Sequence, residues 1–232
     1  MKKNIVCDVR LPNEMKIILQ NHYNLLEFSA KNMVEEPLSG HPDIFLAQIH
    51  ENLIIAPNTP KYLVDWFNFH HVEYQFGQHN VGFSYPEIAK YNVSTNQNFL
   101  LCNAEICDSE ILKFSKNLEI IKVKQGFCRC STLILEEDVF ITSDQGIFKV
   151  LKNKNLEVRF FSDLDILLPG YRHGLLGGCL GIDKENRRII VSGSLRSIAN
   201  GENLQLLLQN LAYDILELGD GRLIDVGGFF VV

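Results

Sequence analysis

Residues 43–76, DIFLAQIHENLIIAPNTPKYLVDWFNFHHVEYQF, contain the pattern that decides the fold. Two short apolar runs, 43–50 and 53–56, are typical of strands joined by a tight turn. The stretch 59–69 begins with a threonine cap and a proline in its first turn, which predicts a helix. Residues 72–76 then form a third apolar run. The unit is therefore strand, strand, helix, strand.

The same order of elements recurs along the chain. Three further copies lie in residues 88–123, 131–161 and 179–218. A fifth copy is divided between the two ends. Its parts are a strand at 222–226 and, at the start of the chain, a strand at 4–9, a helix at 13–20 and a strand at 24–28.

Self-similarity at about 40 residues is a signature of repeat architectures. A unit this small cannot bury its own apolar face, and pairing the chain ends within one unit removes an exposed edge. We therefore expect a single α/β domain over residues 1–232: a five-bladed α/β propeller closed by pairing of the N- and C-terminal segments. The alternative is an open α/β sheet in which strands and helices alternate.

The composition indicates a soluble protein with no nucleic-acid partner. Apolar residues make up 46% of the chain, charged residues 22%, and the formal net charge is −6. Proteins that bind nucleic acid usually present a basic face, and this chain has no dense cluster of Lys and Arg. No apolar run approaches the roughly 20 residues of a membrane span, and no export signal is evident. We expect a cytoplasmic protein without a membrane partner; its oligomeric state is not indicated.

The six cysteines are expected to be free thiols. A core of this size needs no disulfides, and the spacings of Cys102 to Cys107 and of Cys128 to Cys130 match no paired zinc motif. We expect no metal site and no cofactor.

The repeat resembles the pentein, or guanidine-modifying-enzyme (GME), fold of arginine and agmatine deiminases, dimethylarginine hydrolases and glycine amidinotransferases. A noncatalytic ribosome anti-association factor shares this fold. Four motifs further resemble an uncharacterised bacterial branch of the superfamily, a domain of unknown function: SGHPDI at 39–44, KQGFCRCST at 124–132, ITSDQGI at 141–147 and GLLGGCLG at 174–181.

The resemblance implies a hydrolase or transferase that acts on a guanidino or amidino compound in a central channel. In such enzymes a cysteine thiolate attacks the guanidinium carbon, a histidine protonates the departing amine, and carboxylates hold the planar cation. His41 and Asp43 match the His-x-Asp motif of the deiminases at the start of a blade. In that match His41 is the general acid and Asp43 binds substrate. The alternative is a turn-capping aspartate next to a packed histidine.

The resemblance is weakest at the nucleophile. The enzymes place it after a glycine-rich turn in the C-terminal blade, but residues 227–232 read GGFFVV and contain no cysteine. A thiol from another blade could replace it, and Cys130 and Cys179, which both follow glycines, are the leading candidates. Each could equally be a small packed residue.

Other polar residues lie at equivalent positions of the blades. The candidates for substrate binding, besides Asp43, are Lys124, Gln125, Asp144 and Asp225. Asp144 also fits a plain helix-start signal. Two classes of function therefore stay open: an enzyme for a small cationic guanidino ligand, and a noncatalytic binding or scaffold protein.

Overall fold

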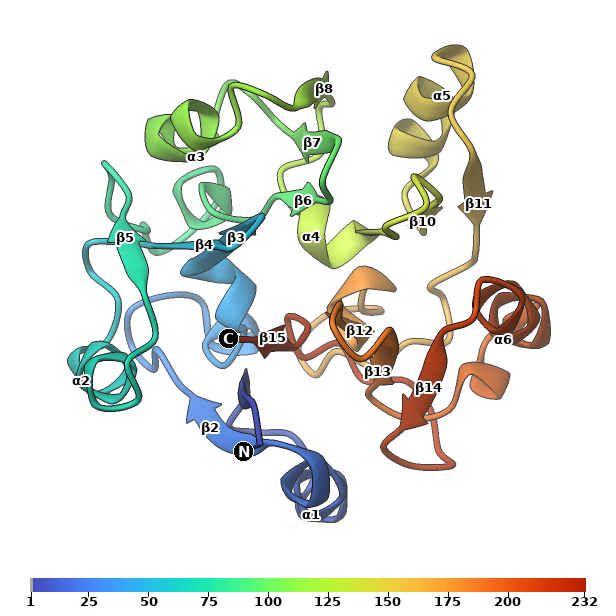
Figure 1. Ribbon diagram of the computed structural model, residues 1–232, viewed down its shortest axis with the longest axis horizontal. Helices are drawn as coiled ribbons and strands as arrows, with labels where there is room; N and C mark the ends of the chain where they lie inside the picture. The colour runs from blue at the N-terminus through green and yellow to red at the C-terminus, as the bar shows by residue number, and fades with distance from the viewer. Residues whose placement is uncertain (1) are drawn as a thin grey trace.

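The computed structural model describes residues 2–232. It contains five separate three-stranded sheets, arranged around a common centre with the main helices on the outside (Figure 1). In every sheet the middle strand pairs antiparallel with one neighbour and parallel with the other. The predicted mixed α/β class is confirmed. No sheet closes on itself within residues 2–232, so the closed propeller stays a prediction.

Four sheets are each built from one continuous segment. The first has β3 (Leu46–Ile49), β4 (Asn52–Ile55), α2 (Lys61–Phe69) and β5 (Tyr74–Phe76). The second has β6 (Ser94–Thr95), β7 (Phe99–Cys102), α3 (Ser109–Phe114) and β8 (Glu119–Lys122). The third has β9 (Thr132–Ile134), β10 (Phe140–Thr142), α5 (Gln145–Asn153) and β11 (Val158–Phe160). The fourth has β12 (Leu180–Asp183), β13 (Arg188–Val191), α6 (Gly201–Asn210) and β14 (Asp214–Glu217).

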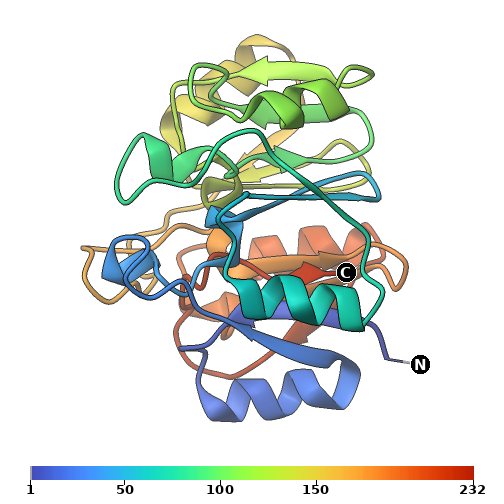
Figure 2. The ribbon, with the colours of Figure 1, turned by 90° about the vertical axis from the view of Figure 1, so that its left-hand side faces the viewer.

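The fifth sheet joins the two ends of the chain. It combines β15 (Phe230–Val231) with β1 (Asn4–Asp8) and β2 (Asn24–Phe28), and α1 (Asn13–His22) connects β1 to β2. Both termini lie on the same side of the molecule, and long loops lie on the opposite side (Figure 2).

The C-terminal partner of β1 is not the predicted one. Residues 222–226 were expected to pair with 4–9, but Val231 and Phe230 pair antiparallel with Ile5 and Val6. Two glycines with positive φ, Gly227 and Gly228, redirect the chain before β15 begins. The predicted segment instead runs beside the fourth sheet, where the N–H of Ile224 donates to the carbonyl of Ser192.

Two predicted first strands were also too long. Pro42–Ile44 forms a 3₁₀ turn, η2, so β3 begins only at Leu46. Glu87–Ala89 forms a similar turn, η3, and the strand that follows, β6, contains only the two residues Ser94–Thr95. A proline just before or within each turn favours the helical backbone over an extended one. The remaining short helical elements are η1 (Glu36–Leu38), α4 (Cys128–Ser131), η4 (Gly177–Cys179) and η5 (Leu195–Ser197).

The hydrophobic core lies between neighbouring sheets. One cluster packs β1, β4 and β7 together, a second joins the sheets of β7 and β10, and a third joins those of β10 and β13. A fourth packs Ile5 and Cys7 of β1 against Ile190 of β13. Burial of apolar side chains between sheets thus holds each small sheet in place. No helix in residues 2–232 has the length and apolar character required to span a membrane.

Candidate functional site

His41 and Asp43 lie at the turn η2, near the middle of the molecule: His41 immediately precedes the turn, and Asp43 lies within it. The backbone of η2 folds back so that the N–H of Phe45 donates to the carbonyl of Pro42. Both side chains are fully buried. The sequence analysis placed this pair at the start of a strand; the structure places it on the turn that precedes the strand.

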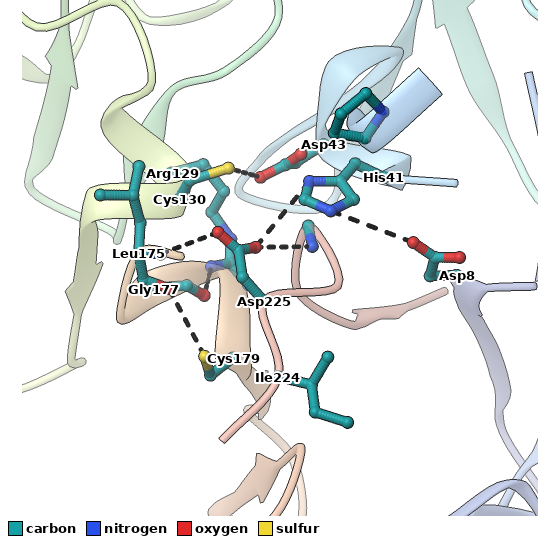
Figure 3. A network of polar contacts seen from close by, with 12 residues as sticks. Asp8, His41, Asp43, Arg129, Cys130, Leu175, Gly177, Cys179, Ile224 and Asp225 are labelled. Atoms are coloured by element: carbon teal, nitrogen blue, oxygen red, sulfur yellow. Dashed lines mark hydrogen bonds and ion pairs between the residues drawn. The ribbon is translucent and has the colours of Figure 1, made fainter. Parts of the chain in front are cut away.

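Cys130 meets Asp43 in this buried centre. It lies on the single-turn helix α4, and its Sγ is 2.7 Å from Oδ2 of Asp43 (Figure 3). The thiol donates and the carboxylate accepts. The two residues are 87 positions apart in the chain, so only the tertiary fold brings them together.

Asn92 holds the Cys130 side of the site in position. Its Oδ1 accepts hydrogen bonds from the backbone N–H groups of Arg129, at 2.8 Å, and Cys130, at 3.2 Å. Its Nδ2 lies 3.4 Å from both Sγ of Cys130 and the carbonyl of Asp43. Sequence reasoning missed this residue, because an isolated asparagine between two apolar residues carries no motif.

Asp225 approaches the same centre from the C-terminal segment. Its Oδ2 accepts the backbone N–H of Leu175 at 2.8 Å, and its Oδ1 accepts that of Gly227 at 3.1 Å. A β-carbon on Gly178 would overlap Oδ1 of Asp225, so the glycine permits this close approach. The carboxylate is thereby fixed in orientation.

The His41 ring lies between two carboxylates. Its Nδ1 is 3.8 Å from Oδ1 of Asp225, and its Nε2 is 4.0 Å from Oδ2 of Asp8 (Figure 3). Neither ring nitrogen makes a well-formed hydrogen bond within residues 2–232. The backbone of Asp225 lies close enough to the ring to raise the pKa of His41, against the larger effect of burial. Asp8 is itself held by Arg10, which donates to both carboxylate oxygens. Asp8, at the end of β1, is a second residue that sequence reasoning missed.

Three side chains able to ligate a metal converge at this point. Ligating atoms of His41, Cys130 and Asp225 all lie within 4.8 Å of one another. No metal site was predicted from the sequence, because the spacings of the cysteines along the chain match no zinc motif. The three residues that converge here are far apart in the sequence.

Burial controls the protonation of the site. It raises the pKa of the Asp43 carboxyl to about 6, against the opposing hydrogen bond from Cys130. Burial, together with the charges of Asp43 and Asp225, raises the pKa of the Cys130 thiol well above its ordinary value. Burial also lowers the pKa of the His41 imidazole and raises that of Asp225. The resting site therefore holds a protonated thiol and a neutral imidazole.

The chain's own guanidinium lies beside this cluster. Arg129, next to Cys130, donates to the carbonyl of Gly177 at 2.7 Å and to that of Leu180 at 2.8 Å. Its guanidinium carbon is 5.8 Å from the centre of the Phe230 ring. This residue ties α4 to the turn η4 and to the C-terminal strand.

The remaining predicted residues lie elsewhere. Gln125 donates to Asp144 at 2.9 Å, and Asp144 caps α5 by accepting the N–H of Ile147. Together with Lys124 they line an open surface pocket of about 770 Å³, not the buried centre. Cys179 is fully buried, and its thiol donates to the carbonyl of Leu175 at 3.5 Å. The structure thus groups His41, Asp43, Cys130 and Asp225 and separates the other four.

Comparison with known proteins identifies the family. A sequence profile described as a family of unknown function (DUF6873) matches residues 6–230. The chain belongs to this family. No curated protein matches the sequence.

The DUF6873 chain is similar in structure to several guanidino-modifying enzymes. A mutant of dimethylarginine dimethylaminohydrolase from Pseudomonas aeruginosa, complexed with citrulline, matches with a TM-score of 0.55 and 8% identity, over 95% of this chain and 93% of that one. An amidinotransferase of saxitoxin biosynthesis from Microseira wollei matches with a TM-score of 0.55 and 10% identity, over 93% of this chain and 88% of that one. The Campylobacter jejuni agmatine deiminase matches with a TM-score of 0.54 and 12% identity, over 94% of this chain and 87% of that one. The predicted likeness to the pentein superfamily is confirmed, and at this identity it establishes the fold alone.

Proposed function

We propose that this protein binds a guanidino or amidino compound at the buried centre and that Cys130 attacks the carbon of that group. The observation that carries the proposal is the 2.7 Å contact between Cys130 and Asp43, beside a histidine whose ring makes no well-formed hydrogen bond within residues 2–232. The likeness to a hydrolase, a deiminase and an amidinotransferase of guanidino compounds supports the same chemistry. We also infer a closed five-bladed propeller, supported by the packing of the sheet of β1 against that of β13.

The residues have separate roles in this proposal. Asp43 accepts the thiol proton, and the sulfur then forms a bond to the guanidinium carbon. The bond between that carbon and the departing amine then breaks. His41, whose ring lies beside Cys130, passes the proton that Asp43 took from the thiol to this amine, which leaves neutral. Water, or an acceptor amine in a transferase, then attacks the same carbon, the bond from carbon to sulfur breaks, and the sulfur regains a proton. Asp225 faces the same space and favours a cationic substrate.

Entry of a substrate requires part of the structure to open. His41 and Asp43 are fully buried, and Cys130 and Asp225 are 2% and 3% exposed. The segment from Gly227 to Phe230 is packed against His41 and Arg129. We propose that this segment moves when the ligand enters, because it covers His41. The movement breaks the pairing of β15 with β1 and the hydrogen bond that the N–H of Gly228 donates to the carbonyl of Gly178.

A ligand screen tests the proposal. Agmatine, arginine, dimethylarginine and creatine are added to the purified chain, and melting temperature and release of ammonia or citrulline are measured. We expect at least one compound to bind and react, Cys130→Ser to abolish turnover, and Cys179→Ser, the matched buried thiol, to retain it. Asp43→Asn removes a carboxylate that faces the cation and also the acceptor of the thiol proton. It should weaken binding by about 1.5–3 kcal/mol, the value of a hydrogen bond to a charged group, and abolish turnover. Turnover that survives Cys130→Ser, or no binding by any of the compounds, overturns the proposal.

A noncatalytic binding protein is the second candidate. It is favoured by the raised pKa of the Cys130 thiol and by the complete burial of the site. In that case native Cys130 stays unreactive toward iodoacetamide, and guanidino ligands do not change its rate of alkylation.

A further inference from the structure

We propose that His41, Cys130 and Asp225 form a binding site for a divalent metal ion, with Zn²⁺ the ion that suits this ligand set best. This inference goes beyond the proposed guanidino chemistry and does not depend on it. It begins from the convergence of an imidazole nitrogen, a thiol sulfur and a carboxylate oxygen within 4.8 Å of one another. His41 immediately precedes η2, Cys130 lies on α4, and Asp225 lies in the C-terminal segment (Figure 3).

The His41 ring supplies the second, independent observation. It is fully buried, yet neither Nδ1 nor Nε2 makes a well-formed hydrogen bond to any of the residues that the structure describes. A buried polar group without a partner costs free energy, so nearly all such groups in proteins are satisfied. A metal ion bound at Nδ1 satisfies the nitrogen that already faces Asp225.

The spacing of the ligand atoms is close to that of a tetrahedral ion. With bonds of about 2.0–2.3 Å, the ligand atoms around Zn²⁺ lie roughly 3.3–3.7 Å apart. The Nδ1 atom of His41 and the Oδ1 atom of Asp225 are already at 3.8 Å. Because the three ligand atoms lie within 4.8 Å of one another, the site closes around an ion through movements of about 1 Å.

Residues around the three ligands hold them in the required orientation. Asp225 is fixed by the N–H groups of Leu175 and Gly227, and Cys130 by Asn92. The Nε2 atom of His41 faces Asp8 at 4.0 Å. A metal-bound histidine commonly directs its second nitrogen at a carboxylate, which orients the ring and raises its basicity. Asp8, anchored by Arg10, is positioned for this role.

The charges at the site also suit a divalent ion. Binding displaces the proton of Cys130, which leaves to Asp43 or to solvent, so the sulfur coordinates as thiolate. The carboxylates of Asp8, Asp43 and Asp225 surround the centre, with Arg10 and Arg129 as the cations nearby. Asp43 lies next to the sulfur, and its Oδ1 has no hydrogen-bond partner within residues 2–232. A coordinated thiolate cannot attack a guanidinium, so metal and substrate exclude each other.

Cobalt substitution tests the site directly. The full-length chain is stripped with a strong chelator and titrated with Co²⁺, and the absorption spectrum is recorded. We expect one ion per chain, a near-ultraviolet thiolate-to-cobalt charge-transfer band, and displacement of Co²⁺ by Zn²⁺. This readout uses the unaltered chain, so misfolding of a variant cannot obscure it. Absence of the charge-transfer band in the unaltered chain overturns the inference.

Variants identify the ligands. Cys130→Ser should remove the charge-transfer band, and Asp225→Asn should weaken Co²⁺ binding. Asp8→Asn, which leaves the three ligands in place, should reduce affinity by about 10- to 100-fold. Cys179→Ser and Cys128→Ser, two other buried thiols, should leave the spectrum unchanged. A band that survives in Cys130→Ser overturns the assignment. The guanidino screen is run on metal-free protein, so failure of either proposal is recognised independently of the other.

Discussion

Asp43 and Cys130 form a buried carboxylate–thiol pair in which Sγ lies 2.7 Å from Oδ2. The pair connects η2, the turn before β3, to α4, the short helix before β9. Asn92 bonds to the backbone of both sides and fixes their separation. The chemical centre of the protein is therefore assembled from turns and loops that precede strands, not from the strands themselves.

Arg129 is expected to be essential for stability. Arg129→Met leaves the carbonyls of Gly177 and Leu180 without their donors and removes a cation from a centre that contains buried carboxylates. Each buried carbonyl left without its donor costs about 1–3 kcal/mol. Urea denaturation monitored by circular dichroism measures the loss. Arg159→Met, at an exposed position, should stay within about 0.5 kcal/mol of the unaltered chain. Equal effects of the two variants would contradict this role.

The last four residues are expected to hold the two ends of the chain together. Phe229 and Phe230 are buried, and β15 pairs with β1. Removal of residues 229–232 takes both buried rings away and should cost about 3–6 kcal/mol, since each buried aromatic contributes roughly 1.5–3 kcal/mol. Removal of Val232 alone is the control and should have a much smaller effect. Thermal melting distinguishes the two, and an unchanged transition in the longer truncation would exclude the pairing.

Gly178 is expected to be required for the position of Asp225. In Gly178→Ala the new β-carbon overlaps Oδ1 of Asp225, so the carboxylate must move. We expect a loss of stability together with weakened binding of Co²⁺ or of a guanidino ligand. Gly221→Ala is the matched control, because nothing lies within 4 Å of its added β-carbon. Both are assayed by ligand titration and urea denaturation. Intact binding in Gly178→Ala would show that Asp225 does not contribute to the site.

Asp108 is expected to contribute a pH-dependent part of the stability. Burial works against its charged form, but backbone N–H groups of Gln78, Glu110 and His79 hold the pKa of Asp108 below its ordinary value. A carboxyl group whose pKa is lower in the folded state stabilises the fold fully at pH values above its unfolded-state pKa of about 3.9. This stabilisation is lost as the pH falls through the folded-state pKa.

Asp108→Asn should therefore lower the free energy of unfolding at pH 7 by about 1–3 kcal/mol and weaken its decline in acid. Urea denaturation from about pH 6 to pH 3 measures both effects. Asp65→Asn, at an exposed position on α2, should leave the pH profile unchanged. A profile for Asp108→Asn parallel to that of the unaltered chain would refute the assignment.

The sequence by itself determined the α/β class, the order of elements in each unit and the sharing of one sheet between the chain ends. These follow from local patterns: apolar runs of strand length, a proline at the start of the helix α2 and turn residues between them. The predicted threonine cap was wrong, because Pro60 occupies the N-cap position of α2 and Oγ1 of Thr59 makes no hydrogen bond within residues 2–232. The sequence analysis placed the C-terminal strand at the wrong residues, because both 222–226 and 229–232 contain enough apolar residues to form a short strand. Only the backbone conformation at Gly227 and Gly228 distinguishes them.

The site itself was decided by the tertiary structure. His41, Asp43, Cys130 and Asp225 were all candidates from the sequence, but so were Lys124, Gln125, Asp144 and Cys179. Local patterns cannot separate the two groups, because contacts such as that of Cys130 with Asp43 span 87 residues. Asp8 and Asn92 carry no motif at all, and only their burial against His41 and Cys130 reveals them. A site formed where distant turns meet depends on how the sheets pack, and the sheets pack through side chains far apart in the sequence.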